Sequence, residues 1–240
     1  MKHLNTYITE YIIKKKLDEP IDSEHNYKYF PNSKDELINI IDKLLDKEIS
    51  DFNCINTSKI RNMSLLFFYK RFNRKQKSIL KDIDISKWDV SNVENMESMF
   101  EDFGSFNCDI SNWNVGKVTS MSYMFYGCNK FNHDLSNWDV SNVENMSYAF
   151  MNCSKFNCDV SNWNVSKVEN MSSMFYECKN FNCDLSKWNV SNVFDINDMF
   201  YDCIKFNCDL SMWYISKVHR RFGTFHNCTS LKNKPIWYQE

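Results

Sequence analysis

Cysteine is the most reactive residue type in this sequence, and nine of its ten cysteines fall into two series with a 25-residue step. Structural zinc sites use Cys-x2-Cys pairs, whereas the closest pairs here are Cys-x4-Cys. Phe103 occupies the equivalent position in the leading repeat, which indicates that this position requires a bulky side chain. We therefore expect free buried thiols and no metal. The first series is Cys128, Cys153, Cys178, Cys203 and Cys228, and the second is Cys108, Cys158, Cys183 and Cys208, with His133 in its vacant place.

Aspartate recurs with the same step, and a serine follows it two residues later in every repeat. Stacked carboxylates repel each other. An Asx turn, in which each carboxylate accepts the backbone N–H two residues on, is the simplest arrangement that keeps them in place. Calcium bridging is the alternative. The aspartates are Asp84, Asp109, Asp134, Asp159, Asp184 and Asp209, and a parallel series that suits a side-chain amide ladder is Asn107, Asn132, Asn157, Asn182 and Asn207.

The sequence contains no set of residues that is typical of an active site and is present only once. Nucleophilic and acid–base catalysis need a constellation that is present once, rather than in every repeat. The four glycines are scattered and cannot form a phosphate-binding loop. We therefore expect no enzyme, no catalytic residues and no cofactor. The histidines, which share no spacing with a serine or an unrepeated cysteine, are His3, His25, His133, His219 and His226.

The elements that position these side chains are copies of one 25-residue unit. In one unit, residues 135–140 are mostly extended, whereas the apolar residues of 143–156 have the three-and-four spacing of a helical or 3-10 turn. A unit this small buries its aromatic residues only by stacking on its neighbours. The sequence therefore predicts an α/β repeat solenoid, with a short strand plus a short helical or 3-10 turn per coil. The tryptophan column is Trp88, Trp113, Trp138, Trp163, Trp188 and Trp213.

The repeat resembles a known family. The run Trp-Asp-Val-Ser-Asn-Val-Glu-Asn-Met-Ser-x-x-Phe from Trp138, followed by Cys-x-x-Phe-Asn from Cys153, is similar to the BspA-like leucine-rich-repeat family in its 25-residue lipoprotein-type variant, whose function is unknown. The resemblance extends from Asp84 to about Cys228. It implies a leucine-rich-repeat-like solenoid, often found on bacterial surfaces, without catalytic activity.

Four segments follow from the repeat boundaries. Ser33 and Glu36 form a capping-box pattern that opens an amphipathic helix to about Lys47, which we expect to cap the solenoid. Pro235 cannot donate to a further ladder, which indicates a second cap. The expected segments are an N-terminal helical cap at 1–50, a degenerate first repeat with a basic insertion at 51–83, tandem repeats at 84–228 and a C-terminal cap at 229–240.

Two of these regions leave alternatives open. The degenerate repeat precedes its neighbour by 33 residues, and the eight-residue insertion within 70–81 that explains this is rich in lysine and arginine. It is either a solvated loop or a contact for an acidic partner. A short helix is expected near the N-terminus, and it either docks on the solenoid end or tethers a partner. Its apolar face is Leu4, Tyr7, Ile8, Tyr11 and Ile12.

Charge and hydropathy bear on partners and location. The net charge of −2 gives no field that favours nucleic acid, so no nucleic acid partner is expected. No run of about 18 apolar residues is present, so no membrane span is expected. The first 16 residues lack a hydrophobic signal core, which favours a cytoplasmic location with reduced thiols. The family resemblance makes a surface location the alternative.

The variable positions between the ladder residues are where a repeat protein recognises its partner. Tyrosines occur there beside acidic residues, and tyrosine is enriched at protein interfaces. We therefore expect a protein-binding scaffold that uses a lateral face, unless the tyrosines only lie across the ladder surface. The alternative is a structural or assembly component, of surface or virion type, without a specific small ligand and self-associating through one end. The tyrosines are Tyr123, Tyr126, Tyr148, Tyr176 and Tyr201.

Overall fold

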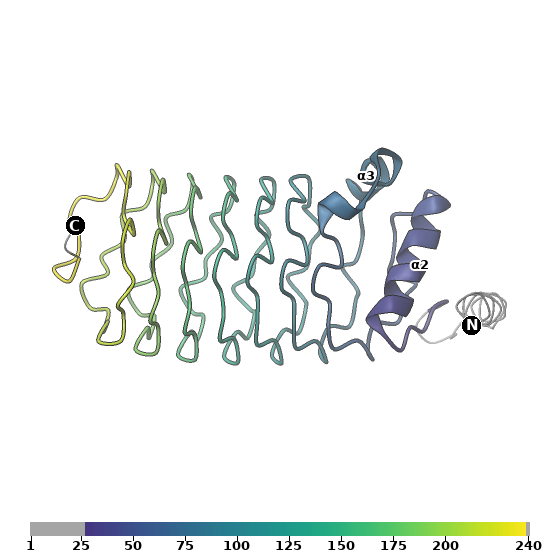
Figure 1. Cartoon of the computed structure of the whole chain (residues 1–240), viewed down its shortest axis with the longest axis horizontal. Helices are drawn as coiled ribbons and strands as arrows, with labels where there is room; N and C mark the ends of the chain where they lie inside the picture. Colours follow the sequence, from purple (N-terminus) through teal and green to yellow (C-terminus); the bar gives the residue numbers. More distant parts are fainter. Residues whose placement is uncertain (1–26, 239–240) are drawn as a thin grey trace.

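The computed structural model describes residues 27–238, which form a row of stacked coils (Figure 1). The N-terminal helix α2 and the C-terminal residues lie at opposite ends of this row (Figure 1). The predicted helix at residues 4–12 lies outside the described residues. Residues 51–83 form a leading coil, and six coils follow it: coil 1 (84–108), coil 2 (109–133), coil 3 (134–158), coil 4 (159–183), coil 5 (184–208) and coil 6 (209–233).

Isolated parallel bridges connect each coil to the next. One column of them follows the 25-residue step, and its first member joins Asn62 to Asn95 with an offset of 33 residues. This offset confirms the alignment of the degenerate first repeat. The other pairs in the column are Asn95–Ser120, Ser120–Asn145, Asn145–Asn170, Asn170–Asp195 and Asp195–Arg220.

Successive turns, rather than a helix, follow the bridge in each coil. In coil 3 the N–H groups of Met146, Tyr148, Phe150 and Asn152 donate to carbonyls of coil 4 at 2.8–3.0 Å. The intervening N–H groups close turns inside the coil, as from Ala149 to the Met146 carbonyl at 3.2 Å. Tyr148 and Asn152 have φ values of 60° and 62°, in the left-handed region. A right-handed helix cannot pass through such residues.

The predicted α/β repeat solenoid, with a strand and a helical or 3-10 turn in each coil, is therefore wrong. Within residues 27–238, helix is confined to α2 (Lys34–Asp46), the 3-10 helix η1 (Tyr69–Arg71) and α3 (Arg74–Leu80), all before coil 1. The described coils contain isolated bridges, and none of them contains a strand of more than one residue. Consecutive four-residue turns bring apolar side chains inward every three or four residues, so their spacing imitates that of a helix.

Aromatic ladders fill the interior of the stack. The tryptophans of coils 1 to 6 are only 3–4% exposed. Each indole Nε1 donates to a backbone carbonyl 28 residues earlier or, in coil 1, 36 residues earlier, at 2.9–3.2 Å. Phe125, Phe150, Phe175 and Phe200 stack with centroid separations of 5.3–5.8 Å. The predicted inward position of the tryptophan column is confirmed.

Helix α2 covers the N-terminal end of the core with five buried residues, Leu37, Ile40, Ile41, Leu44 and Leu45. Ser33 Oγ accepts the Glu36 N–H at 3.2 Å, as predicted, but the Glu36 carboxylate accepts the N–H of Asn32 at 2.7 Å instead of completing a capping box.

The basic insertion forms η1 and α3 instead of the expected loop, and four of its cations pair within the chain, including Lys81 at 3.7 Å from Asp82. Lys70 lies 2.6 Å from Asp102, Arg71 3.1 Å from Asp42, and Lys75 2.9 Å from Glu48. This favours a structural surface segment over a contact for an acidic partner.

Residues 229–238 lie over the tryptophan side of coil 6. Trp237 stacks on Trp213 with a centroid separation of 6.3 Å and an interplanar angle of 2°. Its Nε1 donates to the Leu210 carbonyl at 2.9 Å, so it extends the tryptophan ladder by one member. Pro235 is buried beside it.

Candidate protein-binding face

The repeated aspartates form the predicted Asx turns in all six coils. Each carboxylate accepts the N–H of the serine two residues on, at 2.8–3.0 Å. In coil 2, the Ser111 N–H and then its hydroxyl hold the pKa of Asp109 below its ordinary value. The Asx turns account for the recurrence of these aspartates, so the calcium alternative is not needed to explain it.

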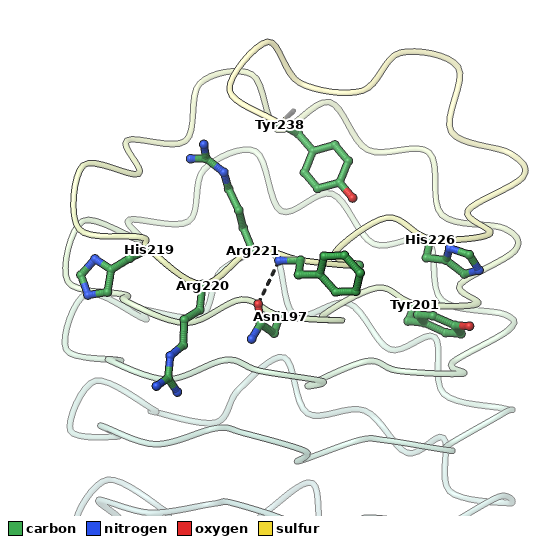
Figure 2. Close-up of a pocket in the computed structure, with 9 residues that line it drawn as sticks. Asn197, Tyr201, His219, Arg220, Arg221, His226 and Tyr238 are labelled. Carbon is green, nitrogen blue, oxygen red and sulfur yellow. Dashed lines mark hydrogen bonds between the residues drawn. The ribbon is translucent and has the colours of Figure 1, made fainter. Parts of the chain in front are cut away.

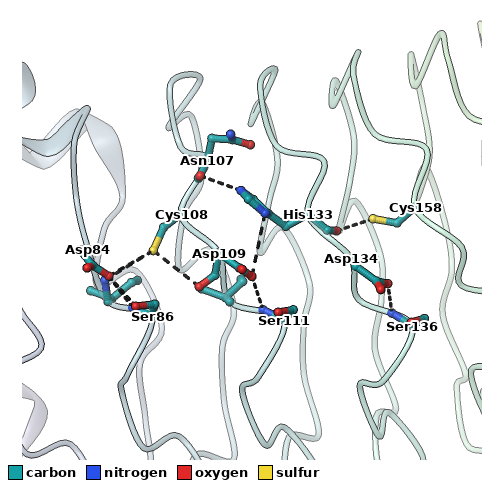
Figure 3. A network of polar contacts seen from close by, with 12 residues as sticks. Asp84, Ser86, Asn107, Cys108, Asp109, Ser111, His133, Asp134, Ser136 and Cys158 are labelled. Carbon is teal, nitrogen blue, oxygen red and sulfur yellow. Dashed lines mark hydrogen bonds and ion pairs between the residues drawn. The ribbon is translucent and has the colours of Figure 1, made fainter.

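The second cysteine series lies beside these turns, and His133 differs from the cysteines there (Figure 3). The Cys108 sulfur accepts the Ile85 N–H at 3.5 Å. The His133 ring contacts residues that lie about one repeat earlier in the sequence. Its Nε2 lies 2.9 Å from the Asn107 carbonyl, and its Nδ1 lies 3.9 Å from the Asp109 carboxylate. Burial raises the pKa of the Cys108 thiol to about 11. Across residues 27–238, no three His, Cys, Asp or Glu side chains are arranged to hold a metal ion.

The first cysteine series is buried and part of the ladder. The Cys153 and Cys178 thiols donate to the carbonyls of Phe125 and Phe150, both at 2.9 Å. Burial raises the pKa of both thiols far above the ordinary value. All ten cysteines are free thiols, so both series stabilise the stack rather than form a reactive site.

The asparagine series also connects coils, although not through amide–amide contacts. Asn132 Oδ1 accepts the backbone N–H of Asn157 at 2.7 Å, and Asn157 Oδ1 accepts that of Asn182 at 2.8 Å. The predicted amide ladder is therefore a ladder from side chain to backbone.

The five predicted tyrosines occupy two neighbouring rows on the turn segment, which we call the tyrosine face. Tyr123 and Tyr148 belong to the first row, and Tyr126, Tyr176 and Tyr201 to the second. All five are half-buried. The first row is Ser98, Tyr123, Tyr148, Ser173, Asp198 and Gly223, and the second is Glu101, Tyr126, Met151, Tyr176, Tyr201 and His226.

The first group of stacked rings lies in coils 2 and 3. Tyr123 stacks on Tyr148 with a centroid separation of 4.4 Å and also contacts Tyr126 at 5.9 Å. Burial raises the pKa of Tyr123, so its hydroxyl is neutral and can donate a hydrogen bond.

The second group lies in coils 4 to 6, where Tyr176 stacks on Tyr201 at 4.6 Å and Tyr201 on His226 at 4.5 Å. Met151 occupies the second row in coil 3 and separates this group from Tyr126. The three second-row tyrosines therefore share equivalent slots, as predicted, but only two of them touch.

A hollow of about 710 Å³ on coil 6 was not predicted from the sequence (Figure 2). The available signal was Arg221, which breaks a 25-residue series of apolar residues formed by Met96, Met121, Met146, Met171 and Ile196. Besides Arg221, the hollow is lined by Asn197, Tyr201, His219, Arg220, Phe222, Gly223, His226 and Tyr238.

No membrane span was expected from the sequence. Within residues 27–238, no helix has both the length and the apolar character needed to cross a membrane.

Comparison with known families gives one assignment. Residues 36–159 and 145–238 both match the family described as "Mycoplasma protein of unknown function, DUF285". The chain belongs to this family. The description assigns no activity, and it does not mention leucine-rich repeats. Comparison with curated proteins finds no match, and neither does comparison with solved structures.

Proposed function

We propose that this DUF285 chain is a non-enzymatic scaffold that binds another protein through the tyrosine face. The supporting observation is the pair of stacked tyrosine groups on the turn segment, one in coils 2 and 3 and one in coils 4 to 6. The resemblance to BspA-like repeats agrees with a binding role without catalysis.

Stacking makes these tyrosines suitable for recognition. A ring already held against its neighbour, such as Tyr176 on Tyr201, loses little conformational freedom when a partner covers it. The half-buried rings offer apolar area, and their hydroxyls offer a polar contact, which is the combination that is enriched in interface cores.

Acidic residues beside the rings favour a partner with basic residues. Glu177 and Asp202 follow Tyr176 and Tyr201 directly, and both have φ values of 56°. The backbone N–H groups of both residues are bonded to the next coil, so the acidic positions are fixed with respect to the tyrosines. Complementary charges at an interface mainly increase association rates and specificity.

The test is affinity capture from a lysate of the source organism with three forms of the full chain. The triple variant Tyr126→Ser, Tyr176→Ser and Tyr201→Ser should lose a protein that the unchanged chain captures, while thermal melting shows that it is still folded at the temperature of the capture. Tyr214→Ser is the matched control, because Tyr214 is 69% exposed and lies outside the tyrosine face.

Two results would contradict the proposal. Capture of the same proteins by all three forms would exclude the tyrosine face. Capture that survives the triple change and fails only when residues 1–16 are removed would assign binding to the N-terminal segment.

A further inference from the structure

Coil 6 is the last coil of the described residues, and a row of its backbone N–H groups has no acceptor among them. In coil 5, the N–H groups of alternate residues donate to coil 6 at 2.8–2.9 Å, for example from Asp198 to Phe222 and from Asp202 to His226. The equivalent groups of coil 6 have no backbone acceptor within residues 27–238. These four N–H groups, which we call the donor edge, belong to Arg221, Gly223, Phe225 and Asn227.

The donor edge borders the hollow of Figure 2, whose lining contains two arginines, two histidines and no carboxylate. Arg220 lies 3.4 Å from Asp195, whereas Arg221 forms no ion pair with any described residue. Phe222 is 85% exposed. The hollow therefore combines positive charge with an exposed apolar ring.

Three acidic groups of coil 5 lie near the hollow. Asp195 is paired with Arg220, and Asp202 accepts a hydrogen bond from the Asn227 side chain at 2.6 Å. Asp198 lies against Gly223, where a Cβ atom would collide with its carboxylate. Gly223 thus makes room for the Asp198 side chain, and the other two carboxylates are already engaged.

A second copy of the chain does not fit this edge. Two-fold pairing through coil 6 would place N–H groups opposite N–H groups. Head-to-tail stacking would need the carbonyl edge of the leading coil. There, Arg71 Nε donates to the Leu66 carbonyl and Arg71 N to the Phe68 carbonyl, both at 3.1 Å, and α2 covers the core. The occupant must therefore supply acceptors that the leading coil of the described residues does not offer.

We propose that the donor edge binds an acidic, extended segment of a partner protein. Its backbone carbonyls accept from the four N–H groups, a carboxylate pairs with Arg221, and an apolar side chain packs on Phe222. Hydrogen bonds to ionised groups are the stronger ones, which favours acidic over neutral segments. Arg221 and Phe222 lie outside both tyrosine rows, although the donor edge adjoins the end of the tyrosine face, since Gly223 belongs to its first row and Tyr201 and His226 line the hollow.

The probe is an eight-residue peptide of alternating glutamate and leucine, with a lysine–leucine peptide as its charge-reversed control. We expect titration of the ¹⁵N-labelled full chain to shift the amide resonances of Gly223 and Asn227. The resonance of Asn152, which occupies the slot of Asn227 in coil 3 but donates to Tyr176 at 2.8 Å, should not move. Equal shifts with the lysine peptide would overturn the proposal.

Variants test the two side chains. Arg221→Glu should weaken glutamate-peptide binding about tenfold or more, as loss of a charge-assisted bond does. Lys205→Glu, the same charge change at an exposed position outside the hollow, should leave the affinity unchanged. Phe222→Ser should weaken binding, while Met212→Ser, also at an 85% exposed residue, should not. Equal effects of target and control variants would overturn the proposal.

Two other occupants have distinct signatures. If inorganic phosphate alone shifts the same amides and displaces the peptide at equal concentration, the edge is a simple anion site. If sedimentation shows a concentration-dependent dimer that Phe222→Ser abolishes, the edge is a self-contact. Either result would overturn the assignment to an acidic segment, and neither would bear on the tyrosine face.

Discussion

Truncation of a mid-stack tryptophan, Trp163→Ala, probes the ladder most directly. Trp163 is 4% exposed, and its ring stacks on Trp188 at 6.5 Å with an interplanar angle of 4°. Phe150 contacts the same ring at 6.2 Å. Its Nε1 donates to the Leu135 carbonyl at 2.9 Å. The variant therefore loses contacts with two coils at once.

The expected loss is about 3–5 kcal/mol of unfolding free energy, the usual cost of deleting a buried aromatic side chain. No further penalty for an unpaired polar group is expected, because the Leu135 carbonyl also accepts the Trp138 N–H at 3.0 Å. For a chain of this size, the loss corresponds to a fall in melting temperature of about 6–20 °C. Trp138→Ala should behave in the same way.

Urea unfolding followed by circular dichroism measures the effect, with two controls. Trp163→Phe keeps an aromatic ring and should cost about 1–2 kcal/mol, for the lost N–H and area. Tyr214→Ala, at a 69% exposed side chain, should stay within about 0.5 kcal/mol. A urea midpoint for Trp163→Ala equal to that of the unchanged chain would refute the inward tryptophan ladder.

Three further predictions concern the turns and the thiols. Asp134→Ala should lower the unfolding free energy by about 1 kcal/mol, because the Ser136 N–H loses its acceptor at 2.8 Å. Asp134→Asn, which keeps an acceptor oxygen, should lower it by less than about 0.5 kcal/mol. Equal urea midpoints for the two variants would contradict the Asx turn. Glu177→Gly should stabilise by about 1 kcal/mol, since φ is 56° there, and Gly127→Ala (φ 73°) should destabilise by at least as much; thermal melting with the opposite order would refute the turn geometry. Stability should decrease as the pH rises above 9.0 toward 12, because burial raises the folded-state pKa of thiols such as Cys183 from 9.0 to about 12, so the unfolded chain ionises first. A urea midpoint that is constant from about pH 8 to pH 11 would contradict it.

The two proposed surfaces use different consequences of the same architecture. The tyrosine face exists because equivalent slots in successive coils lie side by side, which stacks Tyr176 on Tyr201. The donor edge lies on the last described coil, where the N–H groups of Arg221 and Asn227 have no backbone acceptor within residues 27–238, whereas their counterparts in coil 5 bond to coil 6. The tyrosine face therefore offers a partner a repeated set of side chains, whereas the donor edge offers it a row of backbone N–H groups.

Several features were determined by the sequence alone because they depend on local spacing. The 25-residue step assigned the tryptophans to the interior, and all six are 3–4% exposed. Asp134 and Ser136 are two residues apart, so their Asx turn closes within the coil. The helix that begins after Ser33 has its own cap and apolar stripe, and it ends at Asp46, one residue from the predicted end.

Only the tertiary structure decided the conformation of the coils and the identity of the open surfaces. Apolar spacing of three and four is common to helices and to successive turns, and the choice was made by carbonyls of the next coil, such as the Ser172 carbonyl that accepts the Tyr148 N–H at 2.9 Å. Those acceptors lie about 25 residues away, outside any local pattern. For the same reason, neither the separation of Tyr126 from Tyr176 by Met151 nor the unbonded N–H groups of coil 6 could be seen before the coils were stacked.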